Sequence, residues 1–129
     1  MHKTIEMSMN RVVNFDFPTD NPEKAKAFFG EIFNWKFTEW LNEGYWLIET
    51  GDKHRHGING SMIKRRHDEH VASIMIQVEN IDITLKKVQE EGGQIVFPKR
   101  TIPKVGYMAY FKDPEENVLC VMQFNSEAK

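Results

Sequence analysis

Cysteine is almost absent from this chain of 129 residues, since Cys120 is the only one. A single thiol excludes an internal disulfide framework and is typical of proteins from the reducing cytoplasm. The first ten residues, Met1–Asn10, also lack the apolar segment of a secretory signal. We therefore expect a cytoplasmic protein whose fold is held together without covalent cross-links.

Long apolar runs and an excess of basic charge are missing as well. No apolar stretch approaches the roughly 20 residues that a membrane-spanning helix requires. Seventeen Lys and Arg against nineteen Asp and Glu give a net charge of −2, so the chain has no basic face for nucleic acid. The one basic cluster, Lys64–Arg66, is followed at once by Asp68 and Glu69 and is interpreted as a solvated linker. The sequence thus predicts neither a nucleic-acid partner nor a membrane partner.

The composition that is present belongs to a globular protein. Hydrophobic residues make up 40% of the chain and charged residues 28%, which is usual for a folded domain. A chain of this length is also long enough to bury a core. We expect one domain spanning residues 1–129.

The first half of the chain predicts one helix and four strands in the order βαβββ. Apolar and polar residues alternate in Arg11–Phe17, as in a half-buried strand, and Pro18 is expected to end it. Asn21 can cap a helix that continues to Asn34. The apolar stripe of this helix consists of Ala25, Phe28, Phe29, Ile32 and Phe33. Three strands follow, at Trp35–Trp40, Tyr45–Thr50 and Gly57–Lys64, with Leu41–Gly44 as a hairpin loop.

The same order of elements then repeats. Val71–Glu79 is expected to be a strand, and Asn80 can cap a helix that stops at Gly92 and Gly93. The remaining strands are Gln94–Lys99, closed by Pro98, then Val105–Lys112 and Val118–Phe124. The sequence therefore predicts an α+β fold of two tandem βαβββ modules, the first over about 11–64 and the second over about 71–124, joined by the linker Arg65–His70.

Each module would leave one face of its sheet uncovered. The first helix is expected to cover the face that carries Val13, Phe15 and Phe17. The opposite face carries Asn14 and Asp16 and must curve around something else. Two such modules together predict a concave, barrel-like sheet, and concave surfaces of this kind bind small molecules.

Several short motifs, taken in order, resemble one protein family. In the first half they are Phe15–Pro18, Asp20–Phe29 and Ile32–Trp35, and in the second half Val78–Asp82, Glu91–Gly93, Gly106–Tyr107 and Asp113–Asn117. This set resembles the glyoxalase-like (vicinal-oxygen-chelate) superfamily from about Val12 to Phe124. One departure is Glu116, where the family usually has glycine in a left-handed turn position, which a non-glycine residue adopts at a cost.

The resemblance implies four positions where catalytic members of the superfamily hold a divalent metal on His and Glu. Those positions fall on Asn14 and Ser73 in the first strands of the modules, and on Ser61 and Cys120 in the last strands. Amides and hydroxyls are weak metal ligands, and one thiol does not anchor a metal alone. We therefore expect no metal and no cofactor at this site. The residues expected to bind a small molecule in its place are Asn14, Asp16, Ser61, Ser73, Met75 and Cys120.

Other residues leave alternatives open. The pairs His54/His56 and His67/His70 are either a displaced metal site or solvated and structural histidines in polar segments. Cys120 is either a nucleophile or a packed thiol, and its apolar neighbours favour packing. Glu49 is a catalytic acid or base if it is buried in its strand, where its pKa would rise, and an ordinary surface carboxylate if it is exposed.

The resulting functional prediction is a small-molecule binding protein of the glyoxalase-like superfamily, without metal at the usual site. The alternatives are a lyase, isomerase or dioxygenase-type enzyme of that superfamily, and an interaction module with a vestigial pocket. The aromatic-rich strands that begin at Trp35 and Tyr45 offer apolar area beyond one small core. We therefore also expect a symmetric homodimer.

Overall fold

The computed structural model describes residues 9–42 and 44–129. The prediction about a secretory signal concerns Met1–Asn10, and most of that segment lies outside the described residues. Glu43 of the expected hairpin loop also lies outside them. The described chain forms two compact units: residues 14–72, and residues 73–129 together with residues 9–13. Within residues 9–42 and 44–129 no helix has the length and apolar character to cross a membrane.

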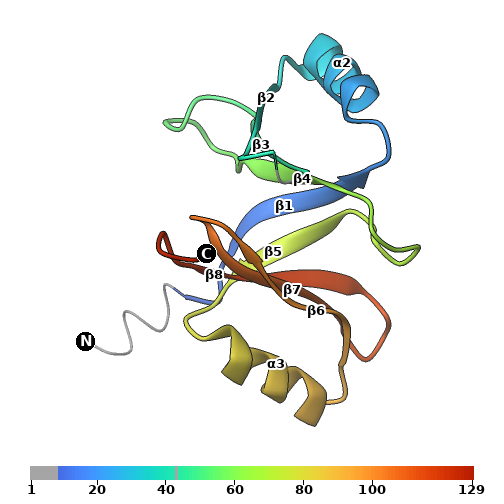
Figure 1. Cartoon of the computed structure of the whole chain (residues 1–129), viewed down its shortest axis with the longest axis vertical. Helices are drawn as coiled ribbons and strands as arrows, with labels where there is room; N and C mark the ends of the chain where they lie inside the picture. The colour runs from blue at the N-terminus through green and yellow to red at the C-terminus, as the bar shows by residue number, and fades with distance from the viewer. Residues whose placement is uncertain (1–8, 43) are drawn as a thin grey trace. The chain divides into compact units, whose positions relative to one another are not determined.

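The first module contains one helix and a four-stranded sheet. Its elements are β1 (Val12–Thr19), α2 (Pro22–Phe33), β2 (Lys36–Glu39), β3 (Tyr45–Glu49) and β4 (Gly60–Lys64). The strands lie in the order β2-β3-β4-β1, and only the β1–β4 pair is parallel. Figure 1 shows this module in blue to green, with α2 labelled beside the strands.

The second module repeats the arrangement. Its elements are β5 (Ser73–Gln77), α3 (Ile81–Glu90), β6 (Gln94–Ile102), β7 (Gly106–Lys112) and β8 (Val118–Phe124). The strand order is β5-β8-β7-β6, again with one parallel pair, β5–β8. Helix α3 packs on β6, β7 and β8 (Figure 1). The expected α+β class and the two βαβββ modules are confirmed.

The register of the sheets confirms the internal repeat at single-residue level. Asp16 on β1 lies opposite Ser61 on β4, and Met75 on β5 lies opposite Cys120 on β8. One constant offset along the chain converts the first pair into the second. The sequence mapping of the two modules onto each other is therefore correct in both parallel strand pairs.

The helix-side face of the first sheet holds the core of that module. Trp46, Ile48 and Met62 are buried there, and Phe15 and Phe17 pack against them. Because side chains alternate between the two faces of a strand, Asn14 and Asp16 lie on the opposite face. This confirms the predicted division of β1 into an apolar face and a polar face.

The helix ends follow the predicted capping residues. Asn21 Oδ1 accepts a hydrogen bond from the Lys24 backbone N–H at 3.1 Å, and Asn34 ends α2 with a left-handed φ of 59°. Asn80 caps α3 in the same way as Asn21 caps α2. The apolar stripe of α2, in contrast, is only partly covered: Phe28, Ile32 and Phe33 are each more than half exposed.

Two prolines do not end strands as predicted. β1 continues through Pro18 to Thr19, because the backbone groups of Phe15 and Thr19 face β4 and those of Pro18 do not. β6 continues past Pro98 to Ile102, with a register shift between Phe97 and Arg100 that accommodates the proline. In both places the strand pairing, which is a tertiary feature, overrides the local signal.

Other strand ends differ by a few residues. β4 begins at Gly60 and not at Gly57, whose φ of +143° does not fit a strand. β5 is shorter at both ends than Val71–Glu79. Gly60 itself lies directly under the Phe15 ring, since a Cβ there would come within 2.4 Å of ring atoms. The β4 backbone therefore approaches the Phe15 side chain closely at this glycine.

Candidate functional site

A buried cluster of polar side chains lies in the first module. Ser61 Oγ donates a hydrogen bond to Asp16 Oδ1 at 2.9 Å, and His70 Nε2 lies 3.8 Å from Asp16 Oδ2. Asp16 and Ser61 are fully buried and His70 is 2% exposed. A carboxylate, a hydroxyl and an imidazole thus share one enclosed position.

Sheet register and one arginine position these three side chains. Asp16 and Ser61 are direct neighbours across the parallel β1–β4 pair, on the face opposite the one that packs with α2. His70 follows the sheet by six residues, and its carbonyl oxygen accepts a 2.6 Å hydrogen bond from Arg65 Nη1. The Arg65 backbone N–H in turn donates to Thr19 O at 2.9 Å, so the segment after β4 is tied to the end of β1.

The burial of Asp16 has an energetic consequence. Transfer of a carboxylate from water to the protein interior costs roughly several kcal/mol of free energy, unless charges and hydrogen bonds compensate for the lost hydration. The Ser61 hydroxyl supplies one hydrogen bond, and His70 supplies a positive charge when its imidazole is protonated. A buried carboxylate beside an imidazole is also a pair of groups able to accept and return a proton.

The second module carries no polar equivalent of this cluster. Met75 takes the place of Asp16 and Cys120 the place of Ser61, and both are fully buried. The Cys120 thiol lies 3.8 Å from the Val121 carbonyl oxygen, in the packed, apolar setting that the sequence favours for it. Ser73 Oγ is buried and has no hydrogen-bond partner within the described residues.

The six predicted ligand-binding residues therefore fall into two sets. Asn14, Asp16 and Ser61 lie in residues 14–72, and Asn14 shares the face of β1 that carries Asp16. Ser73, Met75 and Cys120 lie in residues 73–129. Within the first set, Asp16 and Ser61 are hydrogen-bonded to each other. Within the second set, Met75 and Cys120 lie opposite each other on paired strands.

The residues that the resemblance assigns to the superfamily's metal positions do not fit a metal. They offer an amide from Asn14, hydroxyls from Ser61 and Ser73, and one thiol from Cys120. Carboxylate, imidazole and thiolate ligands hold divalent metals in proteins, and the Ser61 hydroxyl already donates to Asp16. No group of three or more His, Cys, Asp or Glu side chains in residues 9–42 and 44–129 is placed to hold a metal.

The histidines and Glu49 can now be assigned to their environments. His54, His56 and His67 are exposed, as the solvated alternative expects, and so are Lys64–Arg66, whereas His70 is buried, as the structural alternative expects. Glu49 is exposed at the end of β3. The structure therefore supports the interpretation of Glu49 as an ordinary surface carboxylate and gives no basis for a buried acid or base.

His70 is a site residue that the sequence indicated only as part of the His67/His70 pair, and not as a partner of Asp16. It stands at the end of a charged run that contains Arg66, Asp68 and Glu69, all exposed, and nothing in the local pattern separates it from them. Its burial depends on contacts with Asp16 and Arg65, which a local pattern does not encode.

Comparison with known proteins identifies the family. The family model of the Glyoxalase/Bleomycin resistance protein/Dioxygenase superfamily matches residues 9–121. The chain belongs to this superfamily. No curated protein matches it at a significant level.

Solved structures of low sequence identity share the fold. A Streptomyces coelicolor methylmalonyl-CoA epimerase variant in complex with 2-nitronate-propionyl-CoA is 8% identical, covers 94% of this chain and 99% of its own, and has a TM-score of 0.64. An NAD-dependent benzaldehyde dehydrogenase from Legionella pneumophila is 17% identical, with 86% and 97% coverage and a TM-score of 0.61. A superfamily member from Vibrio splendidus is 13% identical, with 89% and 98% coverage and a TM-score of 0.56.

Proposed function

We propose that this glyoxalase-like protein binds a small organic molecule and works without a metal at the usual superfamily position. The observation that carries the proposal is the hydrogen bond from Ser61 to Asp16. At the position where catalytic relatives present a metal ligand, this chain presents a hydroxyl that is already engaged by a buried carboxylate. A polar side-chain pair stands where the superfamily metal chemistry would need a ligand.

The proposed ligand-binding residues are Asn14, Asp16 and Ser61 in the first module and Ser73, Met75 and Cys120 in the second. The first set is short and polar, and the second combines a hydroxyl with apolar, polarisable side chains. Side chains of these two kinds suit small organic molecules that have one or two polar groups. The unpaired, buried Ser73 hydroxyl supports the proposal, because a buried polar atom without a partner is normally satisfied by water or a ligand.

Metal analysis tests the first half of the proposal. The full chain, purified without chelators, is expected to contain well below one equivalent of Mn, Fe, Co, Ni or Zn by elemental mass spectrometry. Its melting temperature is expected to be unchanged by added Ni²⁺ or Zn²⁺, since a metal that bound the native state would raise it. A stoichiometric metal that disappears in Asn14→Ala or Cys120→Ala would overturn the assignment.

Ligand-dependent melting tests the second half. A panel of small aromatic and aliphatic acids, alcohols and amides is expected to include compounds that raise the melting temperature of the parent. The shift is expected to vanish in Ser73→Ala and to persist in Asp68→Ala, a control at an exposed position. If no compound raises the melting temperature, or if the shift is unchanged in Ser73→Ala, the result contradicts this proposal and supports the interaction-module alternative.

A second function is favoured by the Asp16–His70 contact of 3.8 Å. These two groups supply the acid and the base that a metal-free isomerase or lyase needs, and they replace Glu49 as candidates. The side chains at the four assigned ligand positions give no comparable support for a dioxygenase-type reaction. A ligand found by melting, incubated with protein in D₂O, would exchange a carbon-bound hydrogen if this alternative holds. Recovery of the ligand without deuterium would count against it.

A further inference from the structure

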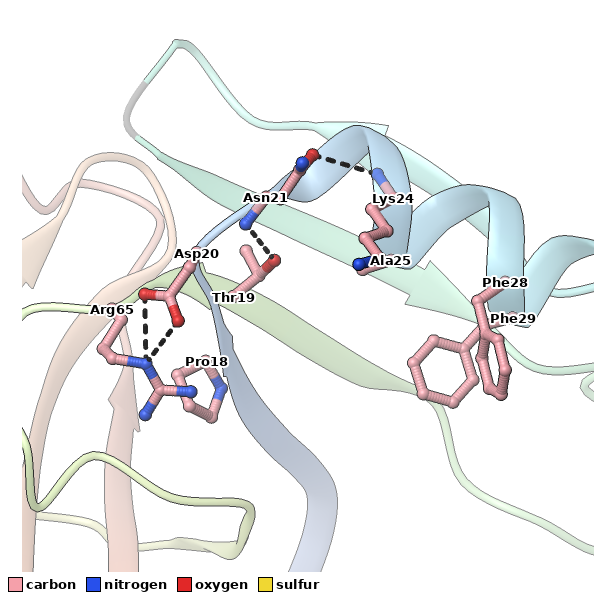
Figure 2. Close-up of a pocket in the computed structure, with 9 residues that line it drawn as sticks. All are labelled: Pro18, Thr19, Asp20, Asn21, Lys24, Ala25, Phe28, Phe29 and Arg65. Carbon is pink, nitrogen blue, oxygen red and sulfur yellow. Dashed lines mark hydrogen bonds and ion pairs between the residues drawn. The ribbon is translucent and has the colours of Figure 1, made fainter.

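A cavity lies at the end of β1 in the first module, beside α2. It has a volume of about 450 Å³ and is formed by the end of β1, the first turns of α2 and Arg65. Figure 2 shows its lining side chains, with the rings of Phe28 and Phe29 at one end and the Arg65 guanidinium beside Pro18 at the other. Volumes of this order are typical of sites for small molecules.

The apolar end of the cavity is rigid and exposed at the same time. Phe29 stacks on Trp35 with ring centroids 5.1 Å apart and an interplanar angle of 12°. Phe28 meets Phe29 edge to face at 5.1 Å and 88°, yet is 56% exposed. Ala25, one turn before Phe28 and Phe29, leaves room in front of the rings. An apolar group of a ligand can therefore pack against these two rings and bury the exposed surface of Phe28.

The polar end carries a fixed cation. Arg65 Nε lies 3.1 Å from both carboxylate oxygens of Asp20, and Nη1 donates to the His70 carbonyl oxygen at 2.6 Å. The two contacts with Asp20, drawn in Figure 2, and the bond to His70 hold the guanidinium plane in place, and none of them uses Nη2. An arginine that is already oriented loses little rotamer freedom when it binds a further acceptor.

The charges around the cavity favour one anionic group. Lys24 lines the cavity from the first turn of α2 and forms no ion pair with any described residue, since the neighbouring Glu23 pairs with Lys26. The charged side chains that line the cavity are thus Lys24, Arg65 and Asp20, an excess of one positive charge. The other polar groups are engaged internally: Asn21 Oδ1 accepts from the Lys24 N–H and Thr19 Oγ1 accepts from the Asn21 N–H.

We propose that this cavity is a binding site for a small amphipathic monocarboxylate, with an aromatic or branched apolar group against Phe28 and Phe29 and its carboxylate between Lys24 and Arg65. The cavity shares Arg65 with the segment that holds His70, but Asp16, Ser61 and His70 do not line it. This proposal therefore does not rest on the function proposed above.

The test uses 3-phenylpropionate as the probe and the full, isotopically labelled chain in two-dimensional NMR titrations. Saturable shifts of backbone signals at residues 18–29 and 65 are expected, with a Kd of about 1 mM for a ligand of this size. The neutral 3-phenylpropanamide is expected to bind several-fold more weakly, by about two- to fivefold, because it lacks the charge that Lys24 and Arg65 recognise. Equal binding of acid and amide, or shifts confined to other residues, would overturn the proposal.

Variants with matched controls complete the test. Phe28→Ala is expected to weaken binding about tenfold, since it removes one of the two rings, and Lys24→Gln about two- to fivefold. Both residues are exposed, so both variants are expected to fold. The controls are Ile83→Ala on α3, whose side chain is also 56% exposed, and Lys26→Gln on α2. If the controls weaken binding as much as the site variants, the cavity is not the site.

Discussion

Asp16 is a residue whose burial has a large energetic consequence. Its carboxylate is fully buried, and its acceptor atoms face the Ser61 hydroxyl and the His70 imidazole. Removing one member of a buried polar group leaves its partner without compensation, which costs more than the interaction itself contributed. The cluster is therefore a feature on which both the stability and the proposed chemistry of the first module depend.

We predict that Asp16→Ala lowers the free energy of unfolding by about 3 kcal/mol, because the Ser61 hydroxyl loses its acceptor and a cavity opens. Asp16→Asn, which keeps an acceptor of the same size, is expected to cost less. The measurement is urea denaturation at neutral pH. Asp68→Ala, at an exposed position, serves as the control and is expected to stay within about 0.5 kcal/mol of the parent. A stable Asp16→Ala variant would show that the cluster contributes nothing.

Gly60 is a second residue whose neighbour dictates its identity. A Cβ at this position would lie 2.4 Å from the Phe15 ring. Gly60→Ala is expected to destabilise the protein by about 2 kcal/mol through overpacking. The matched control is Gly51→Ala, where a Cβ meets nothing within 4 Å.

A double-mutant cycle distinguishes this clash from a backbone effect. In a Phe15→Leu background the ring is gone, so the penalty of Gly60→Ala is expected to shrink. The same penalty in both backgrounds would show that the Phe15 ring is not the cause.

At the scale of elements, the turn between β7 and β8 is held by one carboxylate. Asp113 accepts hydrogen bonds from the Asn117 side chain at 2.9 Å, from the Asn117 backbone N–H at 2.8 Å and from the Glu115 backbone N–H at 2.9 Å. The Asn117 side-chain hydrogen bond, followed by the backbone bonds, lowers the pKa of Asp113 below its ordinary value of 3.8. Glu116 takes the left-handed position expected from the sequence, with a φ of 69°.

This depressed pKa predicts the sign of a pH dependence. Because the pKa of Asp113 is lower in the folded state, its contribution to stability is complete above the ordinary value of 3.8 and is lost as the pH falls through the lower folded value. Asp113→Ala is therefore expected to melt below the parent at pH 7, with a difference that narrows in strongly acidic buffer. Melting curves between neutral and strongly acidic pH measure it, with Glu115→Gln as the control. A difference that widens toward acid would contradict the assignment.

At the scale of the whole molecule, the exposed apolar area lies elsewhere than the sequence suggested. Tyr45 is 1% exposed, and Trp35 packs in the aromatic cluster with Phe29, so both belong to the module itself. Helix α2 carries a run of uncovered apolar side chains, since Phe28, Ile32 and Phe33 are 56%, 56% and 55% exposed. A closed two-fold contact is the commonest way to bury such a surface.

We predict a homodimer that covers Ile32 and Phe33. Light scattering at micromolar concentration is expected to give twice the chain mass of 15.2 kDa. Ile32→Asp is expected to shift the protein to monomer, because it places a charge in the contact. Ile83→Asp on α3, at a side chain of equal exposure, is the control and is expected to leave the dimer intact. A parent mass near 15 kDa would refute the dimer.

The sequence by itself determined the elements and their repeat. The caps at Asn21 and Asn80, the period of the helices and the turn at Asp113 are encoded by residues a few positions apart, so local chemistry is sufficient to predict them. The family resemblance predicted the offset between the two modules, which the strand register confirms. It also predicted on which strands the ligand positions lie.

Only the tertiary structure decided which side chains meet. Ser61 reaches Asp16 across 45 residues of chain, and His70 joins them from a segment whose composition suggested solvent. Pro18 stays inside β1 because its partner strand does not need its N–H. These outcomes depend on strand register and on neighbours that are remote in sequence, and no local pattern of charge or hydrophobicity carries that information.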